Sequence, residues 1–167
     1  MLFIYRFITT LFYPFFIIVI YVRRLLNKED NDRFKEKIFP SNFFPNKDNN
    51  KQLIWFHAAS IGEVQSIFPI IQELIVNKKN IEILITTVTL SSGNIVKKKL
   101  NKFSNIKHRY FPLDVNFLIK KFLDIWKPNI VIFVDSEIWP NLIIEIKKRE
   151  IPIALINGRI TSETFNR

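Results

Sequence analysis

A hydroxyl and a carboxylate stand three residues apart at Ser60 and Glu63, shortly after the apolar run Leu53–Phe56. Small residues and Gly62 lie around them, where a buried strand would end and a helix would begin. Ligands of open α/β sheets bind outside the carboxyl ends of the strands, so Glu63 could act as a general base there. The same spacing is typical of a capping box, and a helix start stabilises a carboxylate. The residues alone leave both interpretations open.

Polar side chains also follow the other predicted strands, and they would gather at one edge of a parallel sheet. Asp135 and Glu137 lie two residues apart, so on an extended chain both would face the same way and could bind a sugar hydroxyl. Capping of a helix near Pro140 is the alternative. Arg159 has the planar fork that binds phosphate or carboxylate, although a surface arginine fits equally well. The remaining polar positions at strand exits are Thr86, Thr87, Thr89, Asp114, Ser136 and Asn157.

Several classes of site are disfavoured by what the sequence lacks. The chain has no cysteine and two histidines, which excludes disulfides and thiolate metal sites and makes a zinc site improbable. No Gly-x-Gly-x-x-Gly follows a strand, and neither a Walker loop nor a Gly-x-Ser-x-Gly elbow occurs. His57 stands among apolar residues, which favours a core histidine over a catalyst. We expect no metal ion at this site.

Five apolar runs alternate with four helical patterns, which predicts an α/β fold with a doubly wound parallel sheet. The run Ile130–Val134 is continuously apolar, as in strands buried on both faces. The expected strands are Leu53–Ala58, Glu82–Thr87, His108–Phe111, Ile130–Val134 and Ile153–Ile156. The expected helices are Glu63–Asn77, Ser92–Asn101, Val115–Trp126 and Trp139–Arg149.

The segment Met1–Val22 carries a single charge, Arg6. As one helix it would be about 33 Å long, close to the roughly 30 Å of a bilayer core, although Arg6 and Pro14 weaken a clean span. No small-residue cleavage site follows it, and the arginines at 23 and 24 place the rest of the chain in the cytoplasm. We expect residues 1–26 to form a membrane anchor or interfacial helix, with a buried core helix as the alternative.

The next segment, residues 27–50, is polar and basic, which predicts a short helix over Asp32–Ile38 and then a linker. Residues 51–167 make up the predicted α/β domain. The chain carries a formal net charge of +10, which favours an anionic partner such as nucleic acid, anionic lipid or a phosphorylated substrate. A solvated basic surface accounts for the charge equally well.

Taken in order, these motifs resemble the N-terminal, acceptor domain of the 3-deoxy-D-manno-octulosonic acid (Kdo) transferases of lipopolysaccharide synthesis. The resemblance covers nearly the whole chain, from the apolar segment that ends in arginines onward. Its motifs are the residues His57–Glu63, Thr86–Thr89 with Gly93, His108–Asp114, Glu137–Asn141, and Ile151-Pro152 leading to Asn157–Arg159.

The resemblance implies the Rossmann-like N-terminal half of a GT-B glycosyltransferase, which transfers Kdo from CMP-Kdo to a lipid A precursor with inversion and without a metal or cofactor. Glu63 matches the family's catalytic base, and Glu137 matches a second glutamate that binds substrate or organises the site. The family also implies the cytoplasmic face of the inner membrane, and an anionic membrane rather than nucleic acid as partner. The other matched positions that we expect to bind substrate are Ser60, Gly62, Thr89, Asn141 and Arg159.

The sequence departs from the family pattern in three places. Asp135-Ser136 replaces the usual Glu-Thr, Gly158 replaces alanine, and the sequence stops at Arg167, before any CMP-Kdo domain. We therefore expect an N-terminal part that is inactive by itself. The alternatives are a non-catalytic, membrane-associated glycolipid-binding remnant and another GT-B lipid glycosyltransferase.

Overall fold

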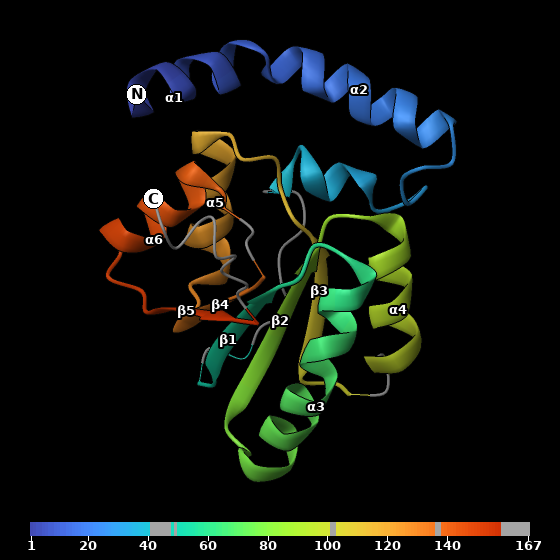
Figure 1. Ribbon diagram of the computed structural model, residues 1–167, viewed down its shortest axis with the longest axis vertical. Helices are drawn as coiled ribbons and strands as arrows, with labels where there is room; N and C mark the ends of the chain where they lie inside the picture. The colour runs from blue at the N-terminus through green and yellow to red at the C-terminus, as the bar shows by residue number, and fades with distance from the viewer. Residues whose placement is uncertain (41–47, 49, 101–102, 136–137, 158–167) are drawn as a thin grey trace, which may run out of the picture.

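Five parallel strands form one sheet in the computed structural model, which describes residues 1–40, 48, 50–100, 103–135 and 138–157 (Figure 1). The strand order is β3-β2-β1-β4-β5, and every neighbouring pair is parallel. This order is that of a doubly wound, Rossmann-like sheet, which confirms the predicted α/β class. The strands are β1 (Gln52–His57), β2 (Ile81–Thr87), β3 (Ile106–Tyr110), β4 (Ile130–Val134) and β5 (Ile153–Ile156).

Helices cover both faces of the sheet, because successive side chains of each strand point to opposite faces. On β1, Trp55 packs with residues of α5 and α6, while Phe56 packs with residues of α3 and α4. All these side chains are removed from water, which stabilises the fold by about 25 cal/mol per Å² of buried apolar area. The helices are α3 (Ile61–Asn77), α4 (Leu90–Leu100), α5 (Asn116–Trp126) and α6 (Pro140–Lys148).

The element boundaries differ from the predicted ones by one or two residues. The first three strands begin earlier than expected, and β3 does so by two residues, because Lys107 and Arg109 interrupt its apolar pattern. Helices α3 and α4 each begin two residues earlier, at Ile61 and Leu90. Backbone hydrogen bonding, which hydropathy does not report, decides these ends.

The N-terminal segment forms two helices, not the single helix that we expected. Helix α1 (Leu2–Leu11) and helix α2 (Tyr13–Leu25) meet at Phe12 with a bend of 54°. Pro14 in the first turn of α2 lacks a backbone N–H, which suits a new helix start and not a continuing helix. By length and composition, none of the described helices could cross a membrane singly, whereas the bent pair of α1 and α2 could.

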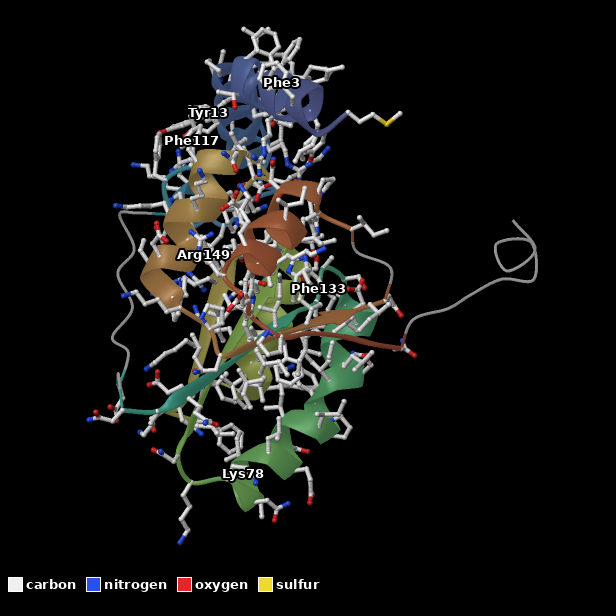
Figure 2. All side chains as sticks on the ribbon, turned by 90° about the vertical axis from the view of Figure 1, so that its left-hand side faces the viewer. Phe3, Tyr13, Lys78, Phe117, Phe133 and Arg149 are labelled. Atoms are coloured by element: carbon white, nitrogen blue, oxygen red, sulfur yellow. The ribbon has the colours of Figure 1, made fainter. Side chains whose placement is uncertain are left out.

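Helices α1 and α2 form an arc across one end of the molecule (Figure 1). Figure 2 shows Phe3 and Tyr13 in this arc, at the opposite end from Lys78, which precedes β2. The arc therefore lies at the end toward which the strands run. Its domain-facing side makes both polar and apolar contacts. The Tyr5 hydroxyl donates to Asp114 (2.8 Å) and the Tyr13 hydroxyl donates to the Ile38 carbonyl (2.6 Å), while Ile20 packs in a cluster with Phe34 and Ile38. The exposed apolar residues of this segment include Phe3, Ile4, Phe7, Ile8, Leu11, Phe12, Phe15, Ile18, Val22, Leu25 and Leu26.

A one-turn 3₁₀ helix, η1 (Phe34–Lys37), replaces the basic helix predicted over Asp32–Ile38. Glu36 accepts the Tyr110 backbone N–H (2.8 Å), and Arg33 donates to the His108 carbonyl (2.8 Å). These two bonds occupy backbone groups on the outer side of β3. Lys37 is buried, where it donates to the Val88 carbonyl (2.8 Å) and pairs with Glu29, whereas Lys97, Lys98 and Lys99 of α4 are exposed.

Candidate functional site

Ser60 and Glu63 form a complete capping box at the start of α3. The Glu63 N–H donates to Ser60 Oγ (3.3 Å), while the Glu63 carboxylate accepts the backbone N–H groups of Ser60 (3.2 Å) and Ala59 (2.8 Å). Glu63 is 8% exposed, whereas Ser60 and Gly62 are exposed. The structural interpretation of this pair is therefore confirmed. Each carboxylate oxygen still has a lone pair beyond the one used for its backbone bond, so the cap does not exclude proton transfer.

Gly93 and Gly62, both near strand exits, differ in whether packing requires a glycine. A Cβ atom placed on Gly93 would lie 2.5 Å from the Tyr110 hydroxyl, so packing explains that glycine. A Cβ atom on Gly62 would meet nothing within 4 Å, and its backbone has no positive φ. Neither packing nor conformation requires a glycine one residue before Glu63. The surface at Gly62 is therefore open, at the exposed start of α3.

The exit of β2 lies against the loop that carries the capping box. The Ser92 hydroxyl donates to the Ala59 carbonyl (3.1 Å), and Thr89 Oγ1 lies 2.7 Å from Ser92 Oγ. Thr89 is exposed. Ser92 thus links Thr89 to the residue before Ser60, so the exits of β1 and β2 lie next to each other. Substrate binding by Ser60, Gly62 and Thr89 stays a prediction.

Asn141 lies in a different environment from Ser60, Gly62 and Thr89, which are exposed. Its side chain is fully buried, donates to the Asp114 carbonyl (2.6 Å) and accepts from Arg6 of α1 (3.2 Å). Asp114 accepts the backbone N–H groups of Asn141 (3.0 Å) and Leu142 (3.1 Å), and burial raises the pKa of its carboxyl. Asn141 and Asp114 therefore fasten α1 to the start of α6. A substrate contact by Asn141 stays a prediction.

His57 is a satisfied core histidine, as its apolar neighbours in the sequence indicated. It has no exposed surface, and burial lowers the pKa of its ring to about 3. Nδ1 lies 2.8 Å from Thr86 Oγ1, and Nε2 accepts the indole N–H of Trp139 (3.1 Å). At neutral pH the ring is uncharged and both of its nitrogens are engaged.

Asp135, the first residue of the predicted acid pair after β4, is not on extended chain. It has a φ of 57°, in the left-handed region, and its carboxylate accepts from the Asn157 side chain (2.8 Å). The condition under which Asp135 and Glu137 would face the same way is therefore not met at Asp135. Glu137 and Arg159 lie outside the described residues. Within the described part of the chain, no group of three or more His, Asp or Glu residues is placed to hold a metal ion.

Sequence reasoning did not find the residues that α1 contributes near the strand exits. Tyr5 and Arg6 were assigned to a lipid-facing segment, yet they bind Asp114, Asn141 and Glu145 across more than a hundred residues of chain. Arg6 was the one signal: a charge within an apolar segment calls for a partner.

Comparison with known proteins gives a consistent assignment. The sequence profile of the family described as 3-deoxy-D-manno-octulosonic-acid transferase matches residues 32–167. A 3-deoxy-D-manno-octulosonic acid transferase of Rickettsia bellii is 33% identical over 162 residues, which cover 97% of this chain and 37% of that protein.

Similar proteins also occur in other organisms. A probable mitochondrial 3-deoxy-D-manno-octulosonic acid transferase of Arabidopsis thaliana is 36% identical over 99% of this chain and 36% of its own length. The enzyme of that name from Haemophilus influenzae is 34% identical over 70% of this chain and 27% of its length. The chain thus spans about a third of the length of these relatives. The chain belongs to the Kdo transferase family.

Proposed function

We propose that this chain forms the acceptor side of a GT-B Kdo transferase of lipopolysaccharide synthesis. In this proposal a lipid A precursor is the acceptor, CMP-Kdo is the donor, and no metal or cofactor takes part. The placement of Glu63 at the carboxyl edge of β1, next to the exposed residues Ser60 and Gly62, is the observation that carries it. In the strand order observed here, β1 lies next to β4, where the order of connections reverses and sheets of this type bind ligands.

Glu63 acts as the general base in the proposed reaction. Its carboxylate takes the proton of the acceptor hydroxyl while that oxygen forms a bond to the anomeric carbon of Kdo. The bond from that carbon to the CMP phosphate breaks on the opposite face, which inverts the centre and releases CMP. The backbone N–H groups of Ala59 and Ser60 hold the carboxylate in place before the substrate arrives. Ser60 and Thr89 lie on the exposed side of the same edge and would bind acceptor hydroxyls.

The proposed location is the cytoplasmic face of the inner membrane. Apolar side chains of α1 and α2 are exposed at the end of the molecule toward which the strands run. Arg23 is paired with Glu29 and Arg24 lies over the Phe34 ring, whereas Lys28, just after α2, is exposed and suits anionic headgroups. This arrangement would bring the site to a phosphorylated glycolipid that is embedded in the bilayer.

Substitution of Gly62 by alanine separates binding from folding. Alanine in the first turn of α3 should stabilise the protein by about 0.5 kcal/mol, because glycine is the poorer helix former. The same methyl group should weaken binding of vesicles that contain lipid A precursor by about tenfold, since an overpacked methyl costs about 1–3 kcal/mol. Gln65→Ala, an exposed change on the same helix, is the matched control. Unchanged vesicle binding by Gly62→Ala would show that the acceptor does not bind at this edge of the sheet.

Catalysis is tested in a polypeptide that carries this chain together with a donor-binding domain. Glu63→Gln keeps the shape of the side chain and should lower Kdo transfer by about 10²–10⁴-fold, the usual contribution of a general base. Asp124→Asn alters an exposed carboxylate on α5 and should leave transfer unchanged. Full activity of Glu63→Gln would show that Glu63 is not the general base.

A further inference from the structure

The imidazole of His57 connects three exits of the sheet. His57 itself ends β1, Thr86 lies near the end of β2, and Trp139 is the residue directly before α6. Both ring nitrogens are within hydrogen-bonding distance of these neighbours: Nδ1 of Thr86 Oγ1 at 2.8 Å, and Nε2 of the Trp139 indole nitrogen at 3.1 Å. The ring also packs against Phe111, which follows β3, with 4.4 Å between ring centroids.

The contacts decide which nitrogen carries the proton. An indole N–H can only donate, so Nε2 must accept and the proton must be on Nδ1. Nδ1–H then donates to Thr86 Oγ1, which also accepts the Trp55 indole N–H (2.8 Å). With the proton on Nε2, or on both nitrogens, two donors would face each other at Trp139. A single protonation state of His57 is compatible with these partners.

The His57 ring is connected to Glu63 through the backbone of Ala58 and Ala59. Ala58, the next residue, donates its N–H to the Thr86 carbonyl (3.0 Å). Ala59 then donates its N–H to the Glu63 carboxylate (2.8 Å). A shift of the His57 ring would therefore move the backbone that holds Glu63, and it would move the start of α6 through Trp139.

We infer that His57 is a positioning residue, which in its neutral Nδ1–H form fixes the Glu63 carboxylate relative to the start of α6. It does not contact substrate. The effect on acceptor chemistry rests on the proposed function, whereas the protonation state and the link to Trp139 do not. These two parts are measured separately.

The first measurement uses ¹⁵N NMR of the full chain in detergent micelles. His57 should show a protonated Nδ1 and an unprotonated Nε2 from pH 5 to 8, with the Trp139 indole N–H assigned through Trp139→Phe. His57→Phe should shift that indole signal, and His57→Gln, whose side-chain oxygen can accept from the indole, should restore it in part. A protonated Nε2, or an indole signal unmoved in His57→Phe, would overturn the inference.

The second measurement uses the matched variant His108→Phe. His108 is also a largely buried neutral histidine, but it binds Thr87 and Arg33 on the β3 side of the sheet. In a polypeptide that also carries a donor-binding domain, His57→Phe should lower kcat for Kdo transfer by about tenfold, because small misplacements of catalytic groups are costly. His108→Phe should destabilise the protein comparably without this loss, and His57→Gln should recover part of kcat.

The outcomes distinguish the inference from the function on which it rests. Absence of transfer in the unmodified polypeptide contradicts the proposed function and leaves the NMR result to decide the link. Transfer that is equally reduced in the two phenylalanine variants contradicts the positioning role. Loss confined to His57→Phe supports it.

Discussion

The starts of α3 and α6 are held in opposite ways, although both lie at the same edge of the sheet. Ser60 and Glu63 cap α3 from within four consecutive residues. Asp114 holds the start of α6 from 27 residues away and is itself supported by Tyr5, a further 109 residues distant in sequence. A local cap forms wherever its helix forms, whereas the distant one exists only when α1, α5 and α6 have assembled. The cap of α3 can therefore be predicted from the sequence, whereas the contacts of Asp114 with α6 cannot.

Removal of the distant cap should have the largest effect. Asp114→Ala leaves two backbone N–H groups of α6 and the Tyr5 hydroxyl without their acceptor in a buried site. Each buried donor left without a partner costs about 1–3 kcal/mol, so we expect a loss of about 3 kcal/mol in the free energy of unfolding. Chemical denaturation measures it. Asp124→Ala removes an exposed aspartate of α5 and should cost less than about 1 kcal/mol. Equal losses of unfolding free energy in the two variants would show that Asp114 contributes no more than an exposed aspartate.

Acid should weaken the long-range contacts through the two histidines. Burial lowers the pKa of His57 and of His108 to about 3, so between that pH and 6.5 the unfolded chain binds more protons than the folded one. Stability therefore falls as the pH is lowered below 6.5, by about 1.4 kcal/mol per histidine between pH 7.5 and 5.5. Replacement of either histidine by glutamine should reduce the measured pH dependence by that amount. An unchanged pH dependence would show that the ring is protonated in the folded protein.

Loss of the local cap should cost less. Ser60→Ala removes one side-chain acceptor at an exposed helix start, for which about 1 kcal/mol is expected from thermal or chemical unfolding. Ser60→Asp keeps an acceptor at the cap and should retain most of the stability. A loss in Ser60→Ala as large as in Asp114→Ala would mean that the local cap depends on tertiary contacts after all.

Glu63→Gln should have the smallest effect on stability, below about 1 kcal/mol. The amide oxygen can still accept one of the two backbone N–H groups that the carboxylate binds. Equilibrium unfolding of this variant, set beside its transfer activity, separates the two roles of the residue. A loss of several kcal/mol would make the capping role dominant.

Local patterns predicted most of the fold and part of the site. The five strands and four domain helices follow from alternating apolar runs, and the Ser60–Glu63 cap follows from its spacing. The buried place of Asn141 and the turn at Asp135 do not, because each depends on contacts with distant segments. The break between α1 and α2 has a local signal in Pro14, which lies in the first turn of α2. Arg6 illustrates the limit: a charge in an apolar segment calls for a partner, but only the assembled fold identifies Asn141 and Glu145.

The 3₁₀ segment η1 has a consequence for how the protein behaves in concentrated solution. An outermost strand normally presents free backbone groups that can pair with a strand of another molecule and begin aggregation. On β3, the side chains of Glu36 and Arg33 already occupy the Tyr110 N–H and the His108 carbonyl. Residues 33–36 thus block edge-to-edge pairing at these two groups, and a preparation that lost them would be expected to form oligomers through β3.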